Sequence, residues 1–238
     1  LDYSGLVESI EVAPVLANED GKEKVYDTID VEKLSLEQSL KSLGIVSWWK
    51  MNGNAEDEVG ENDGELYGDT DCSVEGVYDK ACSFDGSGDY VNVGSYDFAE
   101  GAIFLWFKGY SDSKIFMGRR ELSKRIYIGA HENILVAGVG DQGWDVIRGI
   151  TDISEGESWH CAVLSWDSEN VNLYLDSSLE YSASQLGTTN SNQNFSIGAV
   201  NDDGSVGNYW DGLIDEVMIF NKVLTDEQVE WLYAQDLS

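Results

Sequence analysis

From Ile45 onward, short apolar segments alternate with turns rich in Gly, Asn, Asp and Ser. The segment 171–176, VNLYLD, alternates most clearly, because Val171, Leu173 and Leu175 share one face of an extended chain. Ten further segments are candidate strands: 45–51, 81–85, 90–94, 102–108, 125–130, 134–139, 145–150, 160–166, 194–200 and 213–220. The pattern predicts an all-β fold, an antiparallel two-sheet sandwich.

Two segments have helical spacing instead. In 35–44, SLEQSLKSLG, the leucines share one helical face, and in 225–235, TDEQVEWLYAQ, the apolar residues do the same. Each begins with Ser or Thr followed three residues later by Gln, which is the pattern of a capping box, and Gly44 ends the first helix. The second helix is therefore expected to close the sandwich at its C-terminal end.

Residues 1–44 differ from the rest of the chain. They contain the only proline, Pro14, and alternate loosely before the first helix. We therefore divide the chain into an N-terminal extension, residues 1–44, with extended segments and a short helix, and a β-sandwich domain, residues 45–238.

One candidate strand, 213–220, carries two adjacent carboxylates in an apolar run. Strict alternation places Asp215 and Glu216 on opposite faces, each among apolar neighbours. Buried carboxylates require a hydrogen-bond donor, an opposite charge or a metal. The pair therefore needs either a specific role or a route to solvent.

The three cysteines suggest one local disulfide. Cys72 and Cys82 flank a loop with turn-forming residues, so a bond between them is geometrically plausible in an oxidising compartment. Cys161 would then be a buried free thiol. No spacing of Cys and His indicates a zinc site.

The composition is strongly acidic, with 45 Asp and Glu against 14 Lys and Arg, a formal net charge of -31 and a pI near 4.1. Such a charge repels phosphate backbones and anionic lipid, so nucleic acid is not an expected partner. The acid excess suits a protein that must stay soluble in salt or one that binds divalent cations, and an ordinary acidic surface explains it equally well.

No apolar run reaches the roughly 18 residues of a membrane span, and no signal peptide is visible. Because the chain begins at Leu1 rather than Met, we expect that an export signal or anchor has been removed. The predicted location is extracellular or on the cell surface.

Four motifs occur in order after Ile45: VSWWKMNGNAEDEVGENDGEL, ACSFDGSGDYVNVG, SWHCAVLSWDSENVNLYLDSS and YWDGLIDEVMIFNKVLTDEQVEWLY. Together they resemble the laminin-G-like jelly-roll family of the concanavalin A-like lectin and glucanase superfamily. The resemblance implies a jelly roll with a short closing helix. Two positions depart from the family pattern, since Cys161 stands where a His is common and Ser177 replaces the Gly of a turn.

The resemblance also implies a structural calcium ion. In related jelly rolls its ligands come from the opening strand, an FDG-like turn and the closing strand, which on this chain correspond to Asn52, Asp85 or the Gly86 carbonyl, and Asp215. Oxygen ligands suit Ca²⁺, and Glu216 would then reach solvent or a capping donor. The alternative is that Asp215 only accepts hydrogen bonds from loop amides.

The triplet Glu61, Asp63 and Glu65 superficially matches the Glu-x-Asp-x-Glu signature of laminarinase-like enzymes in the same superfamily. Those enzymes carry it on a mid-sequence strand, whereas here it follows the first strand in a segment rich in Gly and Asn, so a solvated loop is favoured. No nucleophile pattern accompanies His131 or His160. We therefore expect no enzymatic activity and no catalytic residues.

Two polar loops with aromatic residues are the candidate ligand sites, because sugars bind aromatic platforms beside amide and carboxylate groups. The first loop contains Asp141, Gln142 and Trp144. The second contains Asn201, Asp202, Asp203, Asn208, Tyr209 and Trp210. For each loop the alternative is ordinary turn chemistry with a Trp packed on the core.

The predicted function is a non-catalytic, extracellular carbohydrate- or protein-binding module with structural calcium, whose partner is a glycan or a cell-surface protein. Two other functions remain open. The chain could be a structural surface or filament subunit that self-associates through residues 1–44, or a glycan hydrolase or lyase that uses Glu61 or Glu65.

Overall fold

The computed structural model describes residues 35–109, 112–121, 124–140, 147–184, 189 and 193–237. The chain divides after Leu34, and the second unit, Ser35–Ser238, contains every described residue. Residues 35–44, which the sequence pattern assigns to the extension, thus belong to the same unit as the β domain. The remainder of the extension lies outside the described part.

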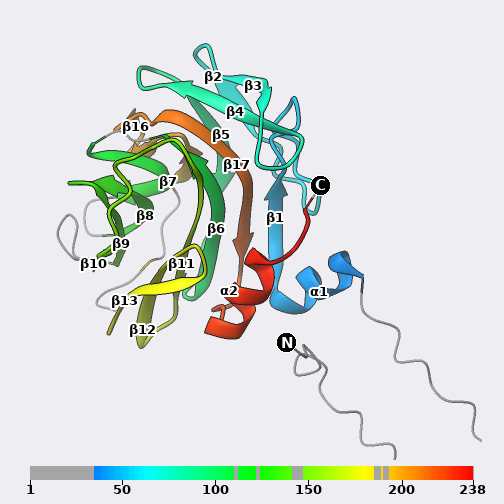
Figure 1. Ribbon diagram of the computed structural model, residues 1–238, viewed down its shortest axis with the longest axis vertical. Helices are drawn as coiled ribbons and strands as arrows, with labels where there is room; N and C mark the ends of the chain where they lie inside the picture. The colour runs from blue at the N-terminus through cyan, green and yellow to red at the C-terminus, as the bar shows by residue number, and fades with distance from the viewer. Residues whose placement is uncertain are drawn as a thin grey trace, which may run out of the picture. The chain divides into compact units, whose positions relative to one another are not determined.

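Two sheets face each other, as the alternating pattern predicts (Figure 1). Sheet A has the order β13 (Ser178–Ser184), β12 (Asn170–Leu175), β11 (Trp159–Trp166), β6 (Gly101–Lys108), β17 (Asp211–Phe220), β4 (Lys80–Asp85) and β3 (Asp71–Glu75), with β1 (Ile45–Trp49) also paired to β17. Sheet B has the order β10 (Ile147–Arg148), β9 (Ile134–Gly140), β8 (Lys124–His131), β7 (Lys114–Glu121), β14 (Asn194–Ile197), β5 (Tyr90–Ser95) and β2 (Glu65–Tyr67). In addition, β15 (Val200–Asp202) pairs with β7, and β16 (Ser205–Gly207) pairs with β15. All pairings are antiparallel except β15 with β7.

Sheet A is covered on both faces, which explains its continuous apolar runs. On β6, Ile103, Leu105 and Phe107 point into the core between the sheets, while Phe104 and Trp106 join a second cluster on the outer face. That outer cluster includes buried residues of both helices, α1 (Leu36–Leu43) and α2 (Asp226–Tyr233). The helices therefore cover sheet A (Figure 1).

Both predicted helix starts are confirmed. Ser35 and Thr225 accept hydrogen bonds from the backbone N–H groups of Gln38 and Gln228, and both capping boxes are complete. Gly44 ends α1 in the left-handed conformation, with φ 84°. In the described part of the chain, no helix combines the length and apolarity needed to cross a membrane.

The structure contains a disulfide between the two cysteines that flank the predicted turn. Cys72 on β3 is bonded to Cys82 on β4, so it links adjacent strands at one edge of sheet A. Cys161 is a buried free cysteine on β11.

Gly198, which follows β14, provides a test of the packing between the sheets. Its φ is 79°, and a Cβ there would lie 2.4 Å from the Phe84 ring. Its N–H donates to the Phe116 carbonyl and its carbonyl accepts from the Trp210 N–H, both at 2.7 Å, so the backbone is held in place. We expect Gly198→Ala to lower the free energy of unfolding by about 2–4 kcal/mol in urea titrations. Gly207→Ala is the matched control, because nothing lies within 4 Å of a Cβ there; equal losses in both variants would contradict this account.

Candidate functional site

Three tyrosines lie close together at one end of sheet B. Tyr67 ends β2 and Tyr90 begins β5, and the two are partners in the strand register. Their rings stack, with centroids 4.5 Å apart and planes 5° from parallel. The Tyr209 ring lies next, 6.4 Å from that of Tyr90. Tyr67 is 36% exposed, so the group presents an accessible aromatic surface.

An amide and a carboxylate side chain lie beside the tyrosines. Val91 on β5 points into the core between the sheets, so Tyr90 and Asn92 face outward. Glu65 is paired with Asn92 across the strands, and its carboxylate accepts a 2.7 Å hydrogen bond from the Tyr67 hydroxyl. Aromatic, amide and carboxylate groups therefore share one patch.

A buried aspartate holds the turns that carry these residues. Asp89 accepts the N–H of Asp69 at 2.7 Å and that of Asp85 at 3.0 Å, which ties the turn after β2 to the turn before β5. Gly68 has φ 70°, and a Cβ there would lie 2.2 Å from the Asp89 carboxylate, so this close approach requires glycine.

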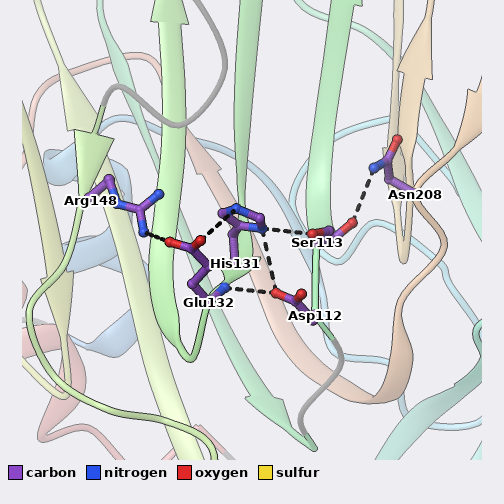
Figure 2. Close-up of polar contacts among 6 residues, drawn as sticks. All are labelled: Asp112, Ser113, His131, Glu132, Arg148 and Asn208. Carbon is purple, nitrogen blue, oxygen red and sulfur yellow. Dashed lines mark hydrogen bonds and ion pairs between the residues drawn. The ribbon is translucent and has the colours of Figure 1, made fainter.

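Figure 2 shows a group of polar side chains that begins at Asn208, the residue before Tyr209. β5 and β7 both pair antiparallel with β14 and so run in the same direction, which places the residues before β7 beside those that begin β5. Asn208 donates through its side-chain amide to the Ser113 carbonyl at 3.1 Å. The Ser113 hydroxyl oxygen lies 2.7 Å from Nδ1 of His131, the last residue of β8.

An acidic pair and an arginine complete this polar group (Figure 2). The Glu132 N–H donates to the Asp112 carboxylate at 2.7 Å, and the Glu132 carboxylate accepts from Arg148 at 2.6 Å. We use the term rim for the combined set: Glu65, Tyr67, Tyr90, Asn92, Asp112, Ser113, His131, Glu132, Arg148, Asn208 and Tyr209.

The rim contains serine, histidine and aspartate, but not in the geometry of a catalytic triad. In a triad, serine and aspartate bind opposite nitrogens of the imidazole. Here the Ser113 hydroxyl at 2.7 Å and the Asp112 carboxylate at 3.5 Å both approach Nδ1, and Nε2 faces Glu132 at 4.0 Å. The arrangement offers hydrogen-bond donors and acceptors rather than an activated nucleophile.

The Glu61, Asp63 and Glu65 triplet does not lie on one strand. β2 begins at Glu65, and the two preceding carboxylates lie in the loop before it, as the sequence pattern indicates. Asp63 accepts the Asp57 N–H at 2.9 Å within that loop. The alternating arrangement of the laminarinase-like signature is therefore missing at these three positions.

The structure separates the residues of the second predicted loop. Asn208 and Tyr209 lie in the rim, whereas residues 201–203 lie on β15 and its turn toward β16. There Asp202 forms an ion pair with Arg120, near the other end of β7.

Trp210 has no exposed surface. Its ring packs edge-on against Phe107 at 6.2 Å and Phe116 at 4.6 Å between the sheets. It matches the alternative of a tryptophan packed on the core and offers no platform to a ligand. The residues of the first predicted loop, Asp141, Gln142 and Trp144, lie outside the described residues.

Asp215 and Glu216 lie at a β-bulge in β17, where the register with β6 shifts between Asp215 and Met218. Glu216 has φ 49°, and Ile214 and Val217, three positions apart, both point into the core between the sheets. Both carboxyls therefore face the helix-covered side of sheet A. The expectation of opposite faces is wrong, because the bulge interrupts the alternation.

The bulge coincides with a change in the partners of β17. β4 pairs with residues 211–214 and β1 with residues 217–220. Asp215 accepts the N–H groups of Val77 at 2.9 Å and Tyr78 at 3.3 Å, from the turn before β4. Glu216 accepts a hydrogen bond from the indole N–H of Trp48 on β1 at 2.5 Å. The pair thus connects β17 to both strands.

Both carboxyls are fully buried. Burial raises the pKa of Asp215 to about 7, and burial together with the neighbouring Asp215 charge raises the pKa of Glu216 to about 8. Glu216 is therefore mostly protonated at neutral pH, which lowers the cost of burying it. Its Oε1 has no hydrogen-bond partner.

The predicted calcium ligands do not form a converging set. Asp215 is engaged by backbone amides, the Asn52 side-chain oxygen accepts the Lys80 N–H at 2.9 Å, and Asp85 accepts the Ser87 N–H at 2.7 Å. In the described part of the chain, no three His, Cys, Asp or Glu side chains form a group that could hold a metal. Asn52 and Asp215 instead hold the turn between β3 and β4, so these residues do not fit the ligand set that the resemblance implies.

A sequence model of a laminin G-like family, described as the concanavalin A-like lectin/glucanases superfamily, matches residues 85–230, more than half of the 238 residues. The chain belongs to this family. Within this laminin G-like chain, the matched residues include β17 and every residue of the rim from Tyr90 to Tyr209. Glu65 and Tyr67 precede the match. A search among curated proteins found no match.

Solved structures share this laminin G-like fold at low sequence identity. Domain 4 of AbnA, an extracellular GH43 arabinanase from Geobacillus stearothermophilus solved with arabinotriose, has a TM-score of 0.64 and 20% identity, over 81% of this chain and 98% of that domain. The binding domain of botulinum neurotoxin serotype C1 has a TM-score of 0.63 and 14% identity, over 82% of this chain and 52% of its own length. The binding domain of botulinum neurotoxin DC, solved in complex with rat synaptotagmin II, has a TM-score of 0.63 and 15% identity, over 82% of this chain and 52% of its own length. This chain therefore spans about half of the toxin domains.

The sequence pattern did not identify most of the rim of this laminin G-like domain. Tyr90 and Asn92 do alternate with Val91 and Val93, which marks them as outward-facing. Their proximity to Tyr67 depends on strand register, for which the sequence contains no direct signal.

The raised pKa of Glu216 predicts how stability depends on pH. The Glu216 carboxyl has a pKa of about 8 in the folded protein and its ordinary value of 4.5 in the unfolded chain. Its contribution to the free energy of unfolding is therefore complete below pH 4.5 and is lost as the pH rises to 8. We expect the wild type to lose on the order of 3–5 kcal/mol across this interval from this group. Glu216→Gln stays neutral and should lack this part of the loss in urea titrations at pH 5 and 8.5. Exposed Glu56→Gln is the control, and a pH profile of Glu216→Gln that matches the wild type would contradict the assignment.

Calcium binding stays a prediction, and the structure indicates which variant tests it. Because the Asp215 carboxyl is buried and accepts amide hydrogen bonds, we expect any calcium-dependent rise in melting temperature to be the same in Asp215→Asn as in the wild type. Differential scanning fluorimetry with calcium or a chelator measures it. A rise that disappears only in Asp215→Asn, with its fold intact by near-UV circular dichroism, would restore the predicted ligand set.

Proposed function

We propose that this laminin G-like domain is a non-catalytic, extracellular carbohydrate-binding module and that the rim is its ligand site. The observation that carries the proposal is the exposed Tyr67, stacked on Tyr90 and hydrogen-bonded to Glu65. Sugar rings present apolar C–H faces and a girdle of hydroxyls, so they require an aromatic surface flanked by polar groups. The rim supplies both.

The known relatives support a binding role. The AbnA domain was solved with arabinotriose, and the entry of botulinum neurotoxin type C into cells depends on two ganglioside molecules. Those ligands belong to those proteins. The inference for this chain is that the shared fold supplies a scaffold and the rim supplies the recognition chemistry.

The non-catalytic assignment rests on the site itself. At His131, Ser113 and Asp112 approach the same ring nitrogen, and the Glu132 carboxylate lies 4.0 Å from the other, beyond hydrogen-bond distance. The Glu61, Asp63 and Glu65 carboxylates do not alternate along one strand. An extracellular location is favoured by the Cys72–Cys82 disulfide, since such bonds persist in oxidising compartments. Self-association through the extension depends on residues outside the described part.

Removal of the Tyr67 ring should weaken glycan binding. We expect Tyr67→Ala to reduce affinity at least tenfold, because the exposed platform is lost, in a glycan array followed by isothermal titration calorimetry. Leu179→Ser is the matched control, since it removes an exposed apolar side chain from β13 in sheet A. Full binding by Tyr67→Ala would exclude the rim as the site, and absence of any glycan ligand for the wild type would contradict the proposed function.

A further inference from the structure

The charged side chains of the rim are mainly acidic. Glu65, Asp112 and Glu132 are exposed carboxylates. Arg148 donates to Glu132 at 2.6 Å, so its charge is already compensated. His131 lies between Asp112 at 3.5 Å and Glu132 at 4.0 Å. The rim therefore offers a ligand more carboxylate acceptors than cationic donors.

Two further carboxylates lie beside the tyrosines. Asp85 ends β4, and its N–H is held by the same Asp89 that precedes Tyr90. Asp211 begins β17 directly opposite Asp85 in the strand register. Both are exposed. The aromatic half of the rim is thus bordered by negative charge, in a chain whose formal net charge is -31.

We infer that the rim selects neutral saccharides and rejects anionic ones such as uronates and sulfated glycans. This inference rests on the binding function proposed above. Neutral sugar hydroxyls can donate hydrogen bonds to the carboxylates of Glu65, Asp112 and Glu132. A carboxylate or sulfate on the ligand would instead meet like charges, and the field of the whole chain would also slow its approach.

The tyrosine stack leaves one face of the Tyr67 ring for a sugar. Tyr90 covers one face of Tyr67, at 4.5 Å. Since β2 is the last strand of sheet B, the other face of Tyr67 points past the sheet edge, with no further strand of that sheet beside it. Glu65 lies two residues away on the same face of β2, within reach of the hydroxyls of a sugar stacked there.

A glycan array that contains both neutral and anionic glycans, probed at low and at high salt, tests the inference. At 20 mM NaCl we expect neutral glycans to dominate the bound set. At 1 M NaCl, where the Debye length falls to about 3 Å, neutral binding should persist and the discrimination against anionic glycans should shrink. A bound set dominated by anionic glycans at low salt would overturn the inference and leave the proposed function intact. Absence of binding to either class would contradict the proposed function, and the inference with it.

A matched pair of ligands then isolates the charge. We would titrate a neutral oligosaccharide that binds on the array and the same oligosaccharide after oxidation of its primary hydroxyls to carboxylates. We expect the oxidised form to bind at least tenfold more weakly to the wild type, and the gap to narrow severalfold in Glu65→Gln, which removes the carboxylate charge nearest to Tyr67. Leu179→Ser should keep the full gap, and Tyr67→Ala should weaken the neutral form. Equal affinities of the two forms for the wild type would overturn the inference.

Discussion

The packing of sheet A depends on two buried carboxyl groups at the bulge in β17, those of Asp215 and Glu216. This strand is continuous from residue 211 to residue 220, but its neighbour on one side changes from β4 to β1 partway along. At such a change the ladder of backbone hydrogen bonds is interrupted, and buried polar groups without partners are costly. Asp215 and Glu216 occupy this point, and their side chains bind the turn before β4 and the Trp48 indole on β1. Two carboxyls are therefore tolerated in an apolar strand because they replace missing strand contacts.

The two sheets thus carry different tasks. The outer face of sheet A is covered by α1 and α2, and there Asp215 and Glu216 connect β17 to its neighbours. Sheet B places Tyr67, Tyr90 and the His131 group at one end, where the ends of several strands meet. The rim is consequently built on strand ends and fixed by Asp89, while its side chains remain accessible. Such positioning on rigid elements favours recognition with little reorganisation.

The sequence pattern predicted the features that depend on local periodicity and failed where distant segments meet. Both capping boxes, the disulfide and the sandwich follow from short-range patterns and are present. The faces of Asp215 and Glu216 were predicted wrongly, because alternation contains no information about a bulge. Tyr209 and Trp210 are adjacent and similar in type, yet one lies in the rim and the other in the core. Trp210 is buried because its ring packs between Phe107 of β6 and Phe116 of β7, which come from different sheets.

Lectins and glucanases both belong to this superfamily, so membership does not determine the activity of this domain. The arrangement of its side chains does. The laminarinase-like hydrolases of this superfamily carry carboxylates that alternate along one strand and flank a glycosidic bond. Here Glu65 is the only member of its triplet on β2, and its carboxylate is hydrogen-bonded to the ring that would support a sugar. A carboxylate held in this way orients the Tyr67 ring. The chemistry of β2 thus fits the glycan-binding role proposed above.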